Sequence, residues 1–323
     1  MDFGVGTTEL CCTAALFATG ILWNVFNLTI SVLHWLKAGQ PVDHIISCIS
    51  ISNVLLELSM FTFLVLLWAD VMFSEEYFPI FKVMTFIWIH SNNMSFWSVA
   101  WLSVFYYVKV VGTSGALFVR LRRNISSLVN AALWLTVLCS FLVCFPLLFL
   151  QLPSFNGTAN NDTQHSISDN QILHFPHWID NNVYVIILMC VLCLVPLLVM
   201  VPCSLRLVVH LCQHTQAMRR NETGFQSADS YLLVCKLTVC LLVVYMSTVS
   251  VVLAFLIGWS PGKFKFVVYV WSLSFFCLAT SVLLTFSNKQ TKEKILSLCC
   301  CWRAARNSPD SREVRSETVA AQN

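Results

Sequence analysis

Charged side chains are scarce in this chain. Of its 323 residues only 11% are Asp, Glu, Lys or Arg, whereas 57% belong to the hydrophobic set, and the mean hydropathy is +0.73. An ordinary soluble domain carries about 25% charged residues. A soluble fold could not hide this much apolar surface, so the composition indicates an integral membrane protein.

The chain also lacks the cysteine spacing of a zinc site or of a disulfide framework. Its 15 cysteines lie mostly inside apolar runs, and no Cys-x-x-Cys pair faces a second one. Cysteines in such runs behave as small hydrophobic residues. We therefore expect no metal and no cofactor, and we also expect no nucleic-acid partner.

No Lys or Arg precedes Lys37, so the basic region of a cleavable signal peptide is missing. We expect the first hydrophobic segment to target the chain to the membrane. A helix needs about 20 apolar residues to cross the hydrocarbon core. Seven windows between charged residues are long enough: Leu10 to Leu36, Ile45 to Ala69, Val83 to Val108, Ile125 to Leu150, Asn182 to Leu205, Leu237 to Ile257 and Phe266 to Ser287.

These windows predict an all-α membrane protein, with a seven-transmembrane helix bundle over residues 1–287 and a cytoplasmic tail over 288–323. If the N-terminus lies outside, 16 of the 19 Lys and Arg residues fall on the cytoplasmic side. The positive-inside rule therefore predicts an outer N-terminus and a cytoplasmic C-terminus. Two N-glycosylation acceptors, Asn156 and Asn161, lie in the predicted second outer loop and agree with this orientation.

The tail begins with a basic stretch that leads to three adjacent cysteines, Cys299, Cys300 and Cys301, beside Trp302. Juxtamembrane cysteines next to basic residues are candidates for S-palmitoylation, in a short segment that lies on the membrane surface. The alternative is an apolar patch at the interface without lipid. Residues 307–323 are polar, and we expect them to be disordered.

Ionisable residues inside the windows are too few for an enzyme. They are Glu57 and His90, with His34 at a membrane edge and His210 just beyond the fifth window, and no two of them share a helix face at three or four residues' spacing. A proton-coupled transporter usually carries several intramembrane carboxylates. These absences favour a G-protein-coupled receptor, with a seven-span transporter as the alternative from another class.

The motifs of the large rhodopsin-like receptor class are absent as well. The inner end of the third window reads Phe105-Tyr106-Tyr107 in place of Asp/Glu-Arg-Tyr, and Ser281 to Ser287 contains no proline. No cysteine lies between Leu152 and Asn181, so the usual disulfide to the second outer loop cannot form.

The stretch Leu102 to Val110, Leu-Ser-Val-Phe-Tyr-Tyr-Val-Lys-Val, closely resembles the third-span signature of bitter-taste receptors (taste receptor type 2). Weaker matches follow in order along the chain: Asn24, Trp35, Lys37, Asp43, Ser52, Asn92, Ser95, Trp97, Leu121, Arg122, Pro196, His214, Met218, Asn221, Lys236, Tyr245, Ser281, Leu284, Asn288 and Lys292. Asn53 replaces an Arg and Thr280 a His of that family, so we expect a divergent member, from a vertebrate other than a mammal. Type 1 vomeronasal receptors are the nearest alternative, but they would not normally carry Phe-Tyr-x-x-Lys here.

The resemblance implies a chemoreceptor for small bitter molecules in the plasma membrane, without enzymatic activity. It also implies a heterotrimeric G protein as partner, with a gustducin-like or other inhibitory-class alpha subunit. The implied ligand-binding residues are Trp88, Asn92, Val270 and Leu273. The residues implied at the G-protein side are Tyr106, Lys109, Arg122 and His214, although the positive-inside rule alone would account for most of the basic residues there.

The residues themselves support part of this site. On a helix Trp88, Asn92 and Ser95 share one face, where an aromatic wall and an amide suit small amphipathic ligands. The alternative is that the amides bond to neighbouring helices, as buried amides in membranes do. We prefer the ligand site for Asn92 and the helix contact for Asn93.

Glu57 lies in the middle of the second window. A lone carboxylate at that depth is costly unless it is protonated or paired. We expect it to bond to Asn24, Asn27 or Asn53 in a structural polar core that links the first, second and seventh windows.

Overall fold

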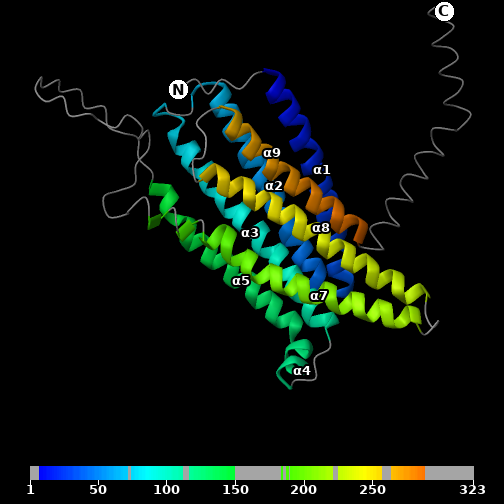
Figure 1. The fold of residues 1–323 in the computed structure, drawn as a ribbon. Coiled ribbons are helices and arrows are strands. Elements are labelled where there is room, and N and C mark those ends of the chain that lie inside the picture. The colour runs from blue at the N-terminus through cyan, green and yellow to red at the C-terminus, as the bar shows by residue number, and fades with distance from the viewer. Residues whose placement is uncertain are drawn as a thin grey trace, which may run out of the picture.

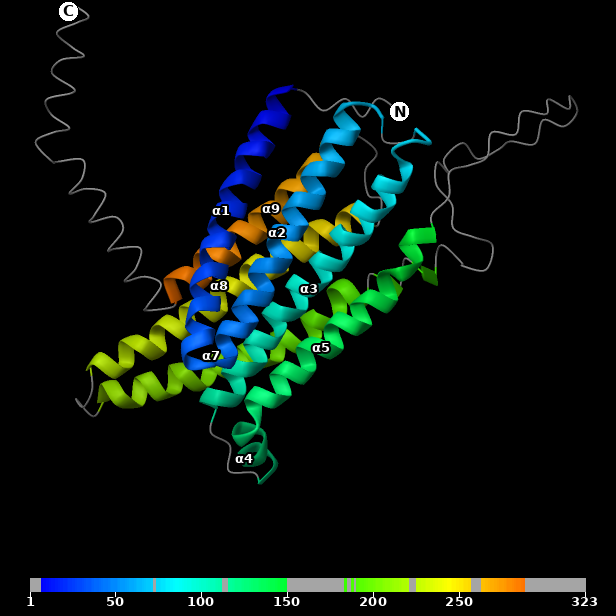
Figure 2. The same cartoon turned by 180° about the vertical axis from the view of Figure 1, so that it is seen from behind.

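The computed structural model describes residues 7–71, 74–111, 116–149, 183–184, 187–188, 190–220, 225–256 and 263–287. All regular structure within these ranges is helical: α1 (Thr7–Ala38), α2 (Pro41–Trp68), α3 (Phe78–Val110), α4 (Ala116–Arg123), α5 (Ile125–Cys144), η1 (Phe145–Phe149), η2 (Cys190–Leu194), α7 (Val195–Arg220), α8 (Phe225–Leu256) and α9 (Lys263–Ser287). Figures 1 and 2 show the long helices side by side in one bundle, with the start of α1 at the end opposite α4.

Six helices of the described chain are long and apolar enough to cross a membrane: Thr7–Lys37, Pro41–Trp68, Ile125–Phe149, Val191–Gln216, Leu233–Phe255 and Val267–Ser287. They lie where six of the seven windows predict helices. The remaining window lies within α3, which has 33 residues but is not among the six. The polar run His90 to Asn93 lowers the hydropathy of α3 below that of its neighbours.

Polar and apolar side chains are distributed as in a bundle surrounded by lipid. Large apolar side chains point outward, with Leu22, Trp134 and Leu198 all at least 70% exposed. The amides of Asn24 and Asn53, by contrast, are completely buried. Water would disfavour so wide an apolar surface, so the distribution confirms a multi-pass helical membrane protein.

Helix α3 lies at the centre of the bundle. It packs against α2, α5 and α7 and touches α8, whereas α9 packs against α1 and α8. In the core the Phe96 ring lies 4.9 Å from the rings of both Tyr245 and Phe276. Edge-to-face aromatic contacts of this kind add to the apolar burial that holds α3, α8 and α9 together.

The turn between α1 and α2 follows from two residues. Gly39 takes a φ of +60°, which glycine adopts without strain, and its N–H donates to the Trp35 carbonyl at 2.8 Å. Pro41 then begins α2, where its missing N–H costs nothing. The tight turn places His34 of α1 in contact with the carboxylate of Asp43 in α2.

A single π-helical turn, η2, lies directly before α7 and close to Pro196. Because proline has no N–H, carbonyl oxygens in the preceding turn lose a helical partner. The Val191 carbonyl accepts from Trp97 Nε1 at 3.2 Å, and the Cys193 carbonyl accepts from the Tyr245 hydroxyl at 3.4 Å. The irregular turn is thereby bonded to α3 and α8.

Candidate ligand site and polar core

The half of the bundle that holds the start of α3 contains a layer of aromatic rings. The Trp88 ring of α3 lies 5.3 Å from Phe63 of α2 and 5.7 Å from Tyr269 of α9. Tyr269 in turn stacks on Phe255 of α8 at 4.5 Å. Four helices thus contribute to one aromatic wall.

Asn92 lies one helical turn beyond Trp88 and one turn before Phe96, so its amide lies between two aromatic layers. It is completely buried, and neither Oδ1 nor Nδ2 has a hydrogen-bond partner among the described residues. Leaving a buried amide unpaired costs about 1–3 kcal/mol for each unsatisfied group. An amide in this setting can donate to and accept from a bound molecule.

Helix α9 also carries the other two expected residues. Val270 and Leu273 are buried in the same apolar cluster as Trp88, Phe96 and Tyr245. Trp88 Nε1 and Ser274 Oγ are further buried polar atoms that have no partner in the described chain. The structure therefore buries Trp88, Val270 and Leu273 in one apolar cluster, with Asn92 one turn along α3 from Trp88, while their role in binding stays a prediction.

Asn93 lies next to Asn92 but on another side of α3. It is buried, and its Oδ1 also lacks a partner within the described ranges. The helix-to-helix bond that we expected is therefore not made through that oxygen. Four residues further along α3, Trp97 faces η2, which indicates that Asn93 points toward the α7 side of the bundle.

A polar core lies deeper in the bundle and joins four helices. Asn53 of α2 donates through Nδ2 to Asn24 Oδ1 of α1 at 3.1 Å and to Thr280 Oγ1 of α9 at 3.3 Å. The Ser95 hydroxyl of α3 donates to Asn53 Oδ1 at 2.6 Å. The sequence pointed to Asn24 and Asn53, but the bond from Ser95 was missed.

A second layer of the polar core follows one turn away. Asn27 Nδ2 donates to the Ser281 hydroxyl at 2.9 Å and to its carbonyl at 2.7 Å, and the Thr285 hydroxyl donates to Asn27 Oδ1 at 2.6 Å. Ser281 and Thr285 share a face of α9 at a spacing of four residues, and this pattern was the available signal for the second layer.

The expected bonds of Glu57 are not present. Its side chain is completely buried, but both carboxyl oxygens lack a partner among the described residues, and Asn24, Asn27 and Asn53 use their amides elsewhere. Glu57 instead faces Gly20 of α1, where an added Cβ would lie 2.0 Å from Oε1. The amides find their partners in one another and in α9, so the hydrogen-bonded core excludes the carboxyl group.

The inner residues lie at the other end of α3. Lys109 is exposed, with Nζ 5.4 Å from the centre of the Phe105 ring, and Tyr106 is half-buried. Arg122 on α4 and His214 on α7 are exposed. All four expected residues are thus at least partly accessible, and their role in G-protein coupling stays a prediction.

Some predicted modification sites lie outside the described residues. They are the glycosylation acceptors Asn156 and Asn161 and the cysteines Cys299, Cys300 and Cys301.

A bundle of long apolar helices that encloses unpaired polar groups agrees with a membrane receptor. A family model described as taste receptor protein (TAS2R) matches residues 3–303. The chain therefore belongs to the taste receptor protein family, whose members are G-protein-coupled receptors and not enzymes.

Individual relatives agree with the family match. The chain is 29% identical to taste receptor type 2 member 40 of Gallus gallus over 224 residues, which cover 68% of this chain and 70% of that receptor. It is 27% identical to taste receptor type 2 member 39 of Macaca mulatta over 251 residues, which cover 74% and 70%. The resemblance that began from Leu102 to Val110 is thereby confirmed.

Proposed function

We propose that this chain is a seven-span chemoreceptor of the plasma membrane that detects small bitter molecules and activates a heterotrimeric G protein. Family membership supports the receptor class, and six apolar helices together with α3 supply seven candidate spans. Among the described residues, Lys37, Lys109 and the three arginines of α4 lie at the α4 end, and this group supports an outer N-terminus.

The buried, unpaired amide of Asn92 is the observation that carries the proposed ligand site. A bitter molecule with one polar group would satisfy the amide, and its apolar part would contact Trp88 and Leu273. Such a site is mostly apolar with a few convergent polar groups, as ligand pockets usually are. The same arrangement suits varied ligands because an amide both donates and accepts.

Helix α3 connects this site to the opposite end of the bundle. Asn92 lies near the aromatic wall, Ser95 bonds to Asn53 in the polar core, and Tyr106 and Lys109 lie at the inner end. A ligand that binds one arrangement of the bundle more tightly would shift the population toward it. We propose that the bonded amides of Asn24 and Asn53 hold the resting arrangement.

The inner end is the proposed surface for the G protein. Tyr106, Lys109, Arg122 and His214 would contact an alpha subunit of the gustducin-like or other inhibitory class. Tyr and Arg are among the residue types that are enriched in protein–protein interfaces.

A calcium-reporter assay tests the receptor function. Cells that express the full chain with a promiscuous G protein should respond to some members of a panel of bitter compounds, and cells without the chain should not. Replacing the promiscuous subunit by gustducin-like and by unrelated alpha subunits identifies the partner class. Solute flux without any G-protein response would contradict the proposal and favour a transporter.

A further inference from the structure

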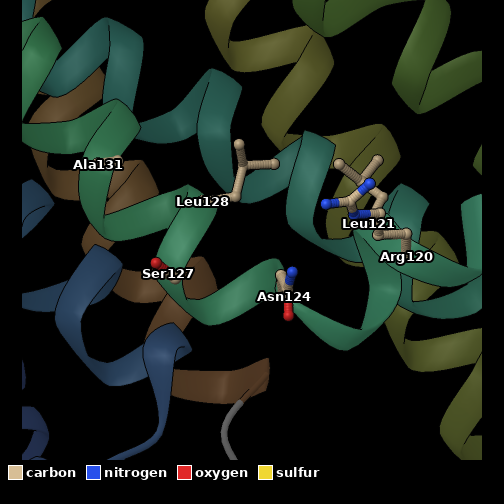
Figure 3. A pocket seen from close by; sticks show the side chains of 6 residues that line it. All are labelled: Arg120, Leu121, Asn124, Ser127, Leu128 and Ala131. Atoms are coloured by element: carbon tan, nitrogen blue, oxygen red, sulfur yellow. The ribbon is translucent and has the colours of Figure 1, made fainter. Parts of the chain in front are cut away.

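A second site lies at the opposite end of the bundle from the ligand site, in the angle between α4 and α5. It is a groove of about 620 Å³ lined by Arg120, Leu121, Asn124, Ser127, Leu128 and Ala131. Figure 3 shows Asn124 at the joint, with Arg120 and Leu121 on one side and Ser127, Leu128 and Ala131 along α5 on the other. The proposed ligand and G-protein residues include none of these six.

One wall of the groove is polar and basic. Arg120 is exposed, and Arg122 and Arg123 follow it on α4. The sequence contains no Asp or Glu between Glu76 and Asp162, and no ion pair is formed by these arginines within the described part of the chain. Asp43, the acid at this end of α2, is in contact with His34.

The side-chain amide of Asn124 does not cap α5 and is available to a ligand in the groove. An Asn at the residue before a helix usually caps it by accepting from the backbone of the first turn. Asn124 makes no such bond through its side chain and is exposed, while its backbone joins α4 to α5 through bonds to Arg120 and from Leu128. Arg120, Asn124 and Ser127 therefore offer three polar side chains to an anion.

The other wall continues as an apolar stripe. Leu128, Ala131, Leu135 and Leu138 lie on one face of α5 and are all exposed, with Leu135 60% and Leu138 57% accessible. The stripe begins in the groove and runs along the helix away from α4. A ligand that fits both walls has an anionic end at Arg120 and an apolar chain along α5.

We propose that the groove between α4 and α5 binds an anionic glycerophospholipid of the inner leaflet, with its phosphate at Arg120, Asn124 and Ser127 and one acyl chain along the α5 stripe. The placement in the inner leaflet rests on the proposed orientation, in which α4 is cytoplasmic. Basic groups at that surface attract anionic lipid, and charge-assisted bonds to phosphate are among the strongest hydrogen bonds in proteins.

Native mass spectrometry of the purified full-length receptor, titrated with phosphatidylserine and with phosphatidylcholine, tests the site. The double variant Arg120→Gln/Asn124→Ala should bind the first phosphatidylserine about tenfold more weakly. Phosphatidylcholine, whose choline balances the phosphate charge, should bind the wild type more weakly than phosphatidylserine and lose less in the variant. Arg206→Gln removes the same charge from an exposed residue of α7 outside the groove, and should leave binding as in the wild type. Equal loss in both variants, or no loss in the double variant, would overturn the proposal.

Two further measurements are needed. The first distinguishes lipid binding from binding of a free anion, and the second distinguishes loss of the site from unfolding of the receptor. Soluble glycerophosphoserine should not displace the bound lipid, because it lacks the acyl chain; complete displacement would show an anion site only and overturn the lipid assignment. Asn124→Asp, which keeps the side-chain shape, should also weaken phosphatidylserine binding, and wild-type binding there would count against the groove. The assay contains no tastant and no G protein, so a silent receptor would contradict the proposed function without touching this inference.

Discussion

Gly20 of α1 and Glu57 of α2 are in direct contact in the interior of the bundle. A Cβ added to Gly20 would lie 2.0 Å from Oε1 and 2.8 Å from Cδ of Glu57. The carboxyl group is completely buried and has no hydrogen-bond partner among the described residues. Close approach of α1 and α2 at this level therefore depends on the missing side chain of Gly20.

Replacement of Gly20 by alanine should destabilise the receptor. The added methyl group forces the buried Glu57 side chain to move, and overpacking of this kind costs about 1–3 kcal/mol. Gly20→Ala should lower both the melting temperature of the purified receptor and its surface expression. Ala18→Leu provides a control that adds bulk on the exposed side of α1, and it should leave both measurements as in the wild type.

The double variant Gly20→Ala/Glu57→Asp tests whether the contact itself is responsible. Shortening the acidic side chain makes room for the new methyl group, so the double variant should be more stable than the sum of the two single changes predicts. Strict additivity would show that the two residues do not interact.

Glu57→Gln should largely preserve expression and signalling. A lone charge at this depth is costly, so a neutral carboxyl group is the expected form, and glutamine reproduces its shape without the charge. Half-maximal agonist concentrations should stay within about twofold of the wild type, since no hydrogen bond within the described chain is lost. Loss of surface expression in this variant would show that the charge is required.

The helices were well predicted from the sequence because apolar length between charges is a strong signal in membrane proteins. Each of the seven windows overlaps a long helix, including the one in α3. Contacts between helices were predicted less well. Asn24 and Asn53 were predicted to lie in a polar core. Their hydrogen-bond partners were not predicted, because the partners depend on how each helix is rotated about its axis, and hydropathy does not determine that rotation. Nothing in the sequence indicated that Gly20 must be a glycine, because that requirement comes from its contact with Glu57 on another helix.

Ser95→Ala should destabilise the bundle more than Ser59→Ala. Both hydroxyls are buried, but Ser95 bonds to Asn53 Oδ1 on another helix, whereas Ser59 bonds to the Leu56 carbonyl of its own helix. Removal of the Ser95 hydroxyl leaves the Asn53 oxygen without this donor, at a cost of about 1–3 kcal/mol. Thermal unfolding of the two purified variants measures the difference, and equal melting temperatures would contradict the role of Ser95.

The ligand site should select only weakly for cationic ligands. Val270 and Leu273 are apolar, and neither they nor Trp88 and Asn92 carry a negative charge. Protonated amines and their neutral analogues should therefore have similar potencies on the wild type, and Val270→Asp should create a preference for the amine. Strong amine selectivity in the wild type that persists after neutralisation of Glu57 and of the outer-loop acids would refute this expectation.

The ligand site was predicted from spacing on α3 together with the family resemblance, and the structure adds what spacing could not show. Trp88 and Asn92 share a face by helix geometry alone. That the Asn92 amide would stay unpaired, while Asn24 bonds to Asn53 and Asn27 bonds to Ser281, depends on which side chains the neighbouring helices present. Asparagines of the same hydropathy thus differ in role: some are bonded to neighbouring helices, whereas Asn92 is unpaired.

The most direct test of the account compares Asn92→Leu with Asn93→Leu in concentration–response curves for an agonist found by the calcium assay. Asn92→Leu removes an unpaired buried amide, so it should leave the melting temperature unchanged or raise it while increasing the half-maximal concentration about tenfold or more. Asn93→Leu, on the side facing α7, should change potency less than about twofold. Equal potencies for Asn92→Leu and the wild type would contradict the proposed ligand site.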